Sequence, residues 1–148
     1  MKTLIFITGI IGASLMACSD NIRATDVPSV VLNTFKTQFP TAAKVEWEKA
    51  EALYEAEFQL ENTAHAVRLT ADGRMAMQKK EIDASHLPIT IQSLLKKNFG
   101  NYLAEDIEQV ETNGLSYYQI ELEKNGKPDE KLVLSSDGTE NTSLPFWD

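Results

Sequence analysis

Two stretches of the chain carry apolar residues four positions apart, which is the spacing of one stripe on an α-helix. The first runs VPSVVLNTFKTQFP from Val27, and the second runs LPITIQSLLKKNFG from Leu87. They align at a constant offset of 60 residues, with a proline second in each, where it suits the first turn of a helix. Each stretch ends at a loop residue, Pro40 or Gly100. The pattern predicts two helices of similar sequence.

Each predicted helix is followed by segments that alternate apolar and polar residues, which is the period of a half-buried strand. YEAEFQL from Tyr54 corresponds to YQIELEK from Tyr118, and VRLTADG from Val67 corresponds to LVLSSDG from Leu132. The last two segments end in Asp-Gly, which favours a type I′ hairpin turn because that turn needs positive φ at both central residues. The pattern therefore indicates an internal repeat, in which a helix is followed by strands twice along the chain. The alternative is a chance likeness between two amphipathic segments.

These elements predict an α+β protein of two tandem repeats, each with one helix and a three- to four-stranded antiparallel sheet. We expect the first repeat at residues 26–83 and the second at residues 84–148. A unit of about 60 residues buries too little surface to be stable alone. The two sheets should therefore join or pack closely, with both helices on one sheet face. The side chains expected to face the helices are Val45, Trp47, Tyr54, Ala56, Phe58, Leu60, Val67, Leu69, Met75, Met77, Ile107, Tyr118, Ile120, Leu122, Leu132 and Leu134.

The start of the chain matches an export signal. Lys2 gives a positive start, and the apolar run LIFITGIIGASL follows, with small residues before Cys18. This run is shorter than the ~20 residues that span a bilayer. The sequence LMAC at residues 15–18 resembles the lipobox of bacterial lipoproteins, although Met16 stands where a small or β-branched residue is usual.

The lipobox resemblance implies that residues 1–17 are removed, that Cys18 carries lipid, and that the polar residues up to 25 form a tether. Lipid chains contribute ~0.8 kcal/mol per buried methylene, so two or three chains hold a small domain at a membrane. The alternative is an ordinary secretory signal that contains a cysteine. Either reading predicts an exported protein, in the periplasm or at the cell surface. Ser19 after the cysteine favours the outer membrane, by analogy with lipoprotein sorting.

The charge of the chain narrows the choice of partners. The formal net charge is −8, and removal of Lys2 with the signal would make it −8 − 1 = −9. So acidic a surface repels phosphate backbones, which excludes nucleic acid as an expected partner. Cys18 is the single cysteine, so no disulfide can form within the mature chain and its stability must come from packing.

Taken together, these features resemble the PepSY-like family of secreted bacterial proteins. They are the export signal, a helix that opens with Val-Pro or Leu-Pro and closes near Phe-Pro, and strands that end in Asp-Gly. The tandem arrangement is similar to the branch compared with β-lactamase inhibitor protein, which is common in Bacteroidetes-type bacteria. The resemblance covers roughly residues 26–140.

The family resemblance implies a non-enzymatic module of the cell envelope with one sheet face free to bind another protein. PepSY-type domains are associated with restraining peptidases, and the inhibitor protein grips its enzyme with a concave sheet. The resemblance brings no shared catalytic residues. A shared fold does not transfer a target either.

The strand alternation places many glutamates on the face turned away from the helices. Like charges opposite each other destabilise a sheet by roughly a few tenths of a kcal/mol per pair, so an accumulation of glutamates needs an explanation. One reason is that Arg68, Arg74 and Lys80 neutralise them and the face is only solvated. Another is a docking surface for a basic patch, with Tyr117 as an aromatic anchor. The candidate partner-binding residues are Glu46, Glu48, Glu55, Glu57, Arg68, Tyr117, Gln119 and Glu121.

The remaining chemistry in the sequence is weak. Cation binding on the acidic face is disfavoured, because calcium takes six to eight oxygens from a loop of fixed spacing. His65 and His86 match no zinc motif and are expected in structural or surface roles. Residues 135–137, Ser-Ser-Asp, lie in a predicted turn without a placed base, and a Gly-x-Ser-x-Gly elbow is absent. We expect no catalytic residue, no metal and no cofactor.

The end of the chain, SLPFWD at residues 143–148, departs from the strand pattern, because Pro145 opposes a central strand. We expect Phe146 and Trp147 to cover an open edge or end of the sheet. The alternative is that they are exposed aromatics available to a partner.

The function expected from these observations is protein binding, inhibitory or regulatory, by an envelope lipoprotein that uses its exposed sheet face. The partner would be an envelope or secreted protein, and the membrane contact would be the lipid anchor alone. One alternative is a periplasmic sensor of a small ligand or cation, with the two repeats closing around a site. Another is a purely structural component of the envelope.

Overall fold

The computed structural model describes residues 20–148. The export signal expected at residues 1–17 and the lipidated Cys18 lie outside the described residues. Across the described part of the chain, neither α-helix is long and apolar enough to cross a membrane.

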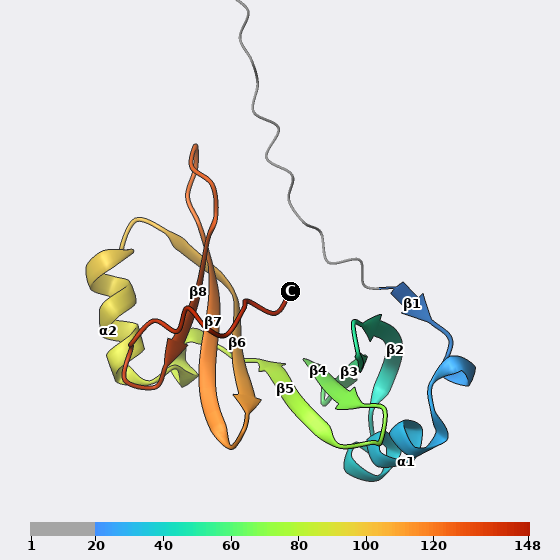
Figure 1. The fold of residues 1–148 in the computed structure, drawn as a ribbon. Coiled ribbons are helices and arrows are strands. Elements are labelled where there is room, and N and C mark those ends of the chain that lie inside the picture. Colours follow the sequence, from blue (N-terminus) through green and yellow to red (C-terminus); the bar gives the residue numbers. More distant parts are fainter. Residues whose placement is uncertain (1–19) are drawn as a thin grey trace, which may run out of the picture.

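The strands form one antiparallel sheet of eight strands, in chain order from β1 to β8 (Figure 1). The elements are β1 (Asp20–Ile22), η1 (Ala24–Asp26), α1 (Ser29–Gln38), β2 (Ala43–Ala50), β3 (Leu53–Leu60), β4 (Thr63–Thr70), β5 (Met75–Glu81), η2 (Ala84–His86), α2 (Ile89–Asn98), β6 (Leu103–Thr112), β7 (Leu115–Glu123) and β8 (Glu130–Ser135). The turns η1 and η2 are single 3₁₀ turns that lead into the two α-helices.

The prediction of two repeats, each with its own three- to four-stranded sheet, is wrong. β5 pairs directly with β6, from Met77 opposite Thr112 to Glu81 opposite Glu108. Through this pairing, the two sheets expected from the sequence pattern form a single sheet. The physical reason is that an edge strand presents unpaired N–H and C=O groups. Joining β5 to β6 satisfies both inner edges at once.

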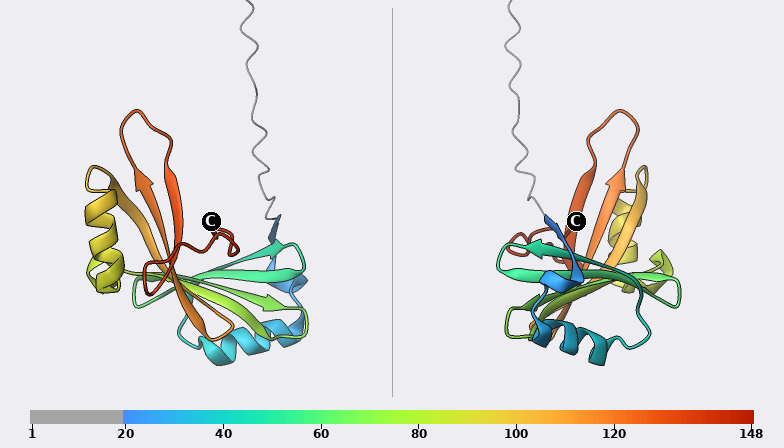
Figure 2. Two further views of the ribbon diagram at one scale, coloured as in Figure 1. Left: turned by 60° about the vertical axis from the view of Figure 1, so that its left-hand side comes forward. Right: turned by 90° about the vertical axis from the view of Figure 1, so that its right-hand side faces the viewer.

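The single sheet is strongly bent, and both helices lie on the outside of the bend (Figure 2). One register row runs through Trp47, Ala56, Val67, Gln78 and Glu111, so the helix side of β2 and that of β6 belong to one continuous face. Register shifts interrupt the β2–β3, β4–β5 and β6–β7 pairs. Such bulges bend strands and increase their twist. We call the helix-bearing side the outer face and the opposite side, within the bend, the inner face.

Each helix covers its own apolar cluster on the outer face. Under α1, the ring of Phe35 meets those of Trp47 and Phe58 edge to face, with centroids 5.2 and 5.1 Å apart. This geometry suits the negative faces and positive edges of aromatic rings. The buried residues of the α1 cluster are Val27, Val31, Phe35, Trp47, Ala56, Phe58, Val67 and Leu69. Those of the α2 cluster are Leu87, Ile91, Ile107, Ile120, Leu122, Leu132 and Leu134.

Met77 lies on the inner face, contrary to the prediction that it faces the helices. Leu69 is opposite Met75, whereas Arg68 is opposite Met77, so Ala76 is an extra residue in β5. This bulge breaks the alternation between positions 75 and 77. Met77 consequently packs in a third cluster, on the inner face.

The Asp-Gly turn between β4 and β5 is not of type I′. Gly73 has a φ of +84°, but Asp72 does not have a positive φ. The Gly73 N–H donates to the Thr70 carbonyl at 2.8 Å, which gives a type I turn followed by a glycine bulge. The turn packs under α1, and a Cβ at Gly73 would lie 3.0 Å from atoms of Val30 and Thr34.

Both ends of the described chain contact the sheet. Asp20–Ile22, in the stretch expected to be a tether, pair with β2 as edge strand β1. Trp147 neither covers an edge nor is exposed, because it is 2% exposed and packs against Ala66 of β4 and Val110 of β6. The C-terminal segment therefore lies within the bend of the sheet (Figures 1 and 2).

Candidate functional site

The predicted residues of β2, β3 and β4 share the inner face. Glu46 lies opposite Glu57 and Glu48 opposite Glu55 across the β2–β3 pair. Glu55 lies in turn opposite Arg68 of β4. The alternation read from the sequence therefore placed these five side chains correctly on one face.

The predicted residues of β7 lie on the same face. A row of register partners crosses the inner face through Glu46, Glu57, Ala66, Lys79, Val110 and Tyr117. Gln119 and Glu121 follow Tyr117 at every second position of β7, so they share its face. Ile120 lies between Gln119 and Glu121, and Leu122 follows them, and both belong to the α2 cluster.

Three glutamates form an acidic strip on β2 and β3, which we define as Glu46, Glu48 and Glu57. Glu46 and Glu57 are exposed, and Glu48 is half-buried. Partial desolvation of the Glu57 carboxyl by the neighbouring strands, followed by the charges of Glu48 and Glu55, raises its pKa above the ordinary value. Within residues 20–148, no member of the strip forms an ion pair. The strip therefore meets solvent as carboxylates without ion pairs, and the charge of Lys79 offsets only part of the repulsion at Glu57.

The cations expected to neutralise this face are mostly engaged elsewhere. Arg68 binds Glu55, with Nε 2.6 Å from Oε2. Arg74 pairs instead with Asp72 in the β4–β5 turn, at 2.9 Å. Lys80 lies on the outer face. Of the three, Arg68 alone pairs with a glutamate of the inner face, and that glutamate is outside the acidic strip.

Two polar residues of the inner face, Glu55 and Gln119, are buried, at 3% and 1% exposed. Leaving such groups without hydrogen bonds costs about 1–3 kcal/mol each. Both find partners on Trp147. The indole Nε1–H donates to Glu55 Oε1 at 2.7 Å. The backbone N–H of Trp147 donates to Gln119 Oε1 at 3.1 Å, and Gln119 Nε2 donates to the Trp147 carbonyl at 2.6 Å.

Two cations flank the indole ring. The guanidinium carbon of Arg68 lies 4.4 Å from the ring centroid, and Lys79 Nζ lies 5.2 Å from it. Lys79 also donates to the Trp147 carbonyl at 2.9 Å and lies 3.2 Å from Glu108 Oε1. Glu108 accepts a further hydrogen bond from Gln119. The result is a connected network of charge and amide groups around one tryptophan.

Tyr117 and Glu121 contact the C-terminal segment at different places. Tyr117 packs in the cluster of Ala66, Val110 and Trp147, so the expected aromatic anchor is partly covered by the chain itself. Glu121 Oε2 lies 3.9 Å from Lys131 Nζ, at some distance along β7 from the tryptophan.

Lys131 binds the last residue of the chain. It donates a hydrogen bond to the Asp148 carboxylate and lies 4.8 Å from the centroid of the Phe146 ring. The hydrogen bond to Asp148 raises the pKa of the Lys131 ammonium. The C-terminal segment is therefore held on both sides of Trp147.

Sequence reasoning missed the role of Trp147, Lys79 and Glu108 in this site. The face of Lys79 depends on the bulge at Ala76, which no local pattern announces. The sequence feature that pointed to the C-terminal segment was Pro145 with the aromatic residues after it. It excluded a central strand there but did not indicate which residues Trp147 contacts.

The acidic strip adjoins the tryptophan site. A hollow of about 340 Å³ is lined by Glu46 and Glu57 of the strip and by Lys79 and Glu108 of the network around Trp147. The strip and the tryptophan site therefore form one continuous inner surface.

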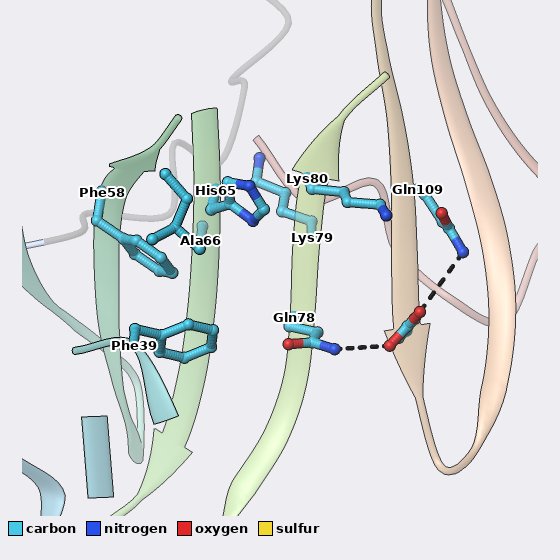
Figure 3. Close-up of a pocket in the computed structure, with 10 residues that line it drawn as sticks. Phe39, Phe58, His65, Ala66, Gln78, Lys79, Lys80 and Gln109 are labelled. Carbon is cyan, nitrogen blue, oxygen red and sulfur yellow. Dashed lines mark hydrogen bonds between the residues drawn. The ribbon is translucent and has the colours of Figure 1, made fainter. Parts of the chain in front are cut away.

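A second pocket, of about 210 Å³, opens on the outer face beside Phe39, the residue that follows α1. Figure 3 shows Phe39, Phe58 and His65 on one side of it and the glutamines of β5 and β6 on the other. The ring of His65 stacks on Phe58 at 5.5 Å, and burial together with the charge of Lys80 lowers the pKa of His65. None of the residues predicted for partner binding lines this pocket.

The two histidines come close to a common hollow. His65 and His86 both line an open hollow of about 660 Å³ beside the β5–α2 connection. In the described part of the chain, no three His, Cys, Asp or Glu side chains are grouped so that they could hold a metal ion.

The protein is an α+β module in which two helices lie outside one bent antiparallel sheet with a polar inner surface. This architecture agrees with the family that the sequence resembles. The chain belongs to the PepSY_like family, described as "Putative beta-lactamase-inhibitor-like, PepSY-like", whose model matches residues 16–79 and 70–139. The resemblance drawn from the sequence is thereby confirmed. None of the curated proteins matches the chain.

Solved structures from Bacteroides share the fold. A "putative periplasmic" protein of Bacteroides eggerthii DSM 20697 superposes with a TM-score of 0.73 at 19% identity, covering 77% of this chain and 85% of that one. A DUF2874 family protein of Bacteroides uniformis ATCC 8492 gives 0.71 at 18% identity, covering 76% and 85%. A BLIP-like protein of Bacteroides fragilis NCTC 9343 gives 0.65 at 19% identity, covering 81% and 92%. At such identities the likeness concerns the fold alone.

Proposed function

We propose that this protein is an exported, non-enzymatic module that binds another protein on the inner face of its sheet. The observation that carries the proposal is the acidic strip. Its three glutamates lie side by side on neighbouring strands, and within the described residues they have no cationic partner. Like charges opposite each other weaken a sheet, and a partner with a basic patch would offset that repulsion.

Binding would combine steering by charge with anchoring at the centre of the face. Exposed charges speed the encounter of complementary surfaces, whereas buried aromatic groups supply most of the affinity. The acidic strip suits the first role, and the surface around Tyr117 and Trp147 suits the second. If the module inhibits its partner, it does so by covering a site. The inhibitor-like description of the family supports this reading.

Export and lipid anchoring belong to the same proposal. The charged start, the apolar run and the lipobox-like residues 15–18 support them, as does the description of the Bacteroides eggerthii protein as "putative periplasmic". β1 begins at Asp20, two residues after Cys18. Two residues span at most ~7 Å, so a lipid on Cys18 would hold the β1 edge of the sheet beside the membrane. Ser19 supports the outer membrane as that location.

A capture experiment tests the docking face. The mature chain with Cys18→Ser is immobilised, exposed to solubilised envelope proteins of its own host, and the eluted proteins are identified by mass spectrometry. The strip variant carries Glu46→Lys, Glu48→Lys and Glu57→Lys. The control variant carries Asp83→Lys, Asp129→Lys and Glu140→Lys, three exposed positions outside β2 and β3. The two variants change the net charge equally.

The proposal predicts a dominant partner whose capture falls at least ~10-fold in the strip variant, persists in the control, and weakens with added salt because exposed charges are screened. Retention of that partner by the strip variant would rule out the acidic strip as the docking surface. Equal loss in both variants would mean that net charge alone governs capture.

A further inference from the structure

The tryptophan site on the inner face recognises a complete amino-acid residue. Trp147 has three polar groups, namely the indole N–H, the backbone N–H and the backbone carbonyl. Each is bound by a side chain of the sheet, from Glu55, Gln119 or Lys79. Neighbouring backbone contributes nothing to these three contacts, in contrast to the pairing of an ordinary strand. The sheet therefore binds Trp147 as a receptor binds a ligand.

The apolar and cationic parts of the site complete this recognition. Ala66 and Val110, both buried, form the surface on which the indole packs. The guanidinium carbon of Arg68 lies 4.4 Å from the ring centroid, which is the geometry of a cation–π contact. A small side chain at Ala66 leaves room for a large ring. Shape, charge and hydrogen bonds thus all match an indole.

The polar groups of the site are also held by the sheet itself. Glu55 is bound by Arg68 at 2.6 Å, and Gln119 by Glu108. Glu108 is in turn paired with Lys79 at 3.2 Å. These contacts do not involve the C-terminal segment, so they orient the site whether or not Trp147 is present. A site ordered in advance binds its ligand with less loss of conformational entropy.

The occupant is attached by a short, mostly exposed segment. The Asn141 N–H donates to the Val133 carbonyl at 2.7 Å, the last backbone bond to the sheet before Trp147. Thr142, Ser143 and Pro145 are exposed. A tether this short gives Trp147 an effective concentration on the order of mM at its site. A competing ligand can exceed that value only by adding contacts of its own, such as contacts to the acidic strip beside the site.

We propose that this site is a receptor for a tryptophan in an extended segment of the partner protein, and that the C-terminal segment is its resident, displaceable occupant. The inference rests on the proposed function, because it names the group that the partner inserts into the inner face. The segment would carry an aromatic residue before the tryptophan and an acidic residue after it. Those are the neighbours that Lys131 contacts in the resident segment, Phe146 and Asp148.

The test uses the full mature chain and a labelled peptide of residues 143–148, SLPFWD, acetylated at its N-terminus. Peptide binding is followed by fluorescence anisotropy. The Trp147→Ala chain should bind the peptide saturably at one site. The unsubstituted chain should bind it at least ~10-fold more weakly, because its own segment competes at high effective concentration. A peptide with alanine in place of tryptophan should not bind.

Matched glutamine variants locate the site. Gln119→Ala, added to Trp147→Ala, should weaken peptide binding at least ~10-fold by removing two hydrogen bonds. Gln109→Ala on the outer face should leave it unchanged. Equal binding with and without Gln119, or no binding to a cooperatively folded Trp147→Ala chain, would overturn the inference.

A second variant covers loss of folding. If Trp147→Ala does not fold, Trp147→Phe keeps a ring in the site but removes the indole N–H. Excess SLPFWD peptide should then raise the melting temperature of Trp147→Phe, since a ligand of the folded state stabilises it. If the melting temperature of Trp147→Phe does not rise at a peptide concentration that saturates the unsubstituted chain, the inference is overturned.

The capture experiment separates this inference from the proposed function. If the partner inserts a tryptophan, Trp147→Ala should raise its capture at least ~10-fold. Loss of capture in the strip variant without a gain in Trp147→Ala would leave the docking function standing and reject the exchange. If the peptide binds but capture of the partner does not depend on the strip, the tryptophan site stands and the acidic strip is rejected as the docking surface.

Discussion

The indole N–H of Trp147 donates a hydrogen bond to Glu55 at 2.7 Å, although the two residues are 92 positions apart. The contact joins the end of the chain to β3, in the first half of the sheet. Trp147 also binds Gln119 of β7, so one residue bridges strands on both sides of the bend. The C-terminal segment thereby connects the two arms of the sheet through side chains.

Loss of Trp147 should destabilise the whole sheet. Trp147→Ala should lower the free energy of unfolding by about 3–5 kcal/mol, because it removes a buried indole and leaves a cavity. Trp147→Phe should cost about 1–3 kcal/mol, because Glu55 Oε1 loses its donor. Urea denaturation followed by circular dichroism measures both. Asp148→Asn, at an exposed position, is the control and should cost less than ~1 kcal/mol. Equal stability of Trp147→Ala and Asp148→Asn would contradict the bridging role.

The ion pair of Glu55 and Arg68 should couple strongly. A double-mutant cycle with Glu55→Gln and Arg68→Met should give a coupling free energy of about 1–3 kcal/mol, because Glu55 is 3% exposed. The matched cycle uses Arg74→Met and Asp72→Asn, whose side chains are 80% and 59% exposed. Solvent screens that pair, so its coupling should stay below ~0.5 kcal/mol. Similar values from the two cycles would show that burial does not strengthen the Glu55 pair.

The acidic strip should leave a signature in the pH dependence of stability. Burial and neighbouring carboxylates raise the folded-state pKa of Glu57 above its ordinary value of 4.5. The folded state therefore holds this proton more tightly, and ionisation of Glu57 destabilises the fold above the raised pKa but not below 4.5. Glu57→Gln should raise the free energy of unfolding by about 0.5 kcal/mol at neutral pH.

The gain from Glu57→Gln should vanish at about pH 3, where the carboxyl is protonated in both states. Urea midpoints at the two pH values measure it. Glu140→Gln, at an exposed position, is the control and should show no such difference. A gain from Glu57→Gln that is equal at both pH values would have another cause.

Gly73 should be less replaceable than Gly126, although both have positive φ, +84° and +76°. Gly126→Ala should cost about 1–2 kcal/mol from the backbone conformation alone, because nothing lies within 4 Å of its added Cβ. Gly73→Ala should cost about 1–3 kcal/mol more, since its Cβ would meet Val30 and Thr34 of α1. Thermal unfolding of the two variants compares them. Equal losses of stability in the two variants would show that α1 can shift to accommodate a Cβ at Gly73 without cost.

The helices and the faces of most strands could be predicted from the sequence. The stretches from Val27 and Leu87 contain α1 and α2, because apolar spacing along a helix depends only on neighbouring residues. For the same reason, the alternation of β2, β3 and β7 correctly placed seven of the predicted residues on one face: Glu46, Glu48, Glu55, Glu57, Tyr117, Gln119 and Glu121. Failure came at Met77, where the bulge at Ala76 shifts the alternation.

The sequence by itself determined both α-helices, most of the strands apart from β1, the acidic character of the inner face and the family. Only the tertiary structure decided that β5 pairs with β6 in one bent sheet, and that Trp147 fills the site made by Glu55 and Gln119. Periodicity records local backbone geometry, which a few consecutive residues define. The joining of two strand edges, and the burial of a carboxylate and an amide beside a distant indole, depend on groups that become neighbours only when the chain has folded.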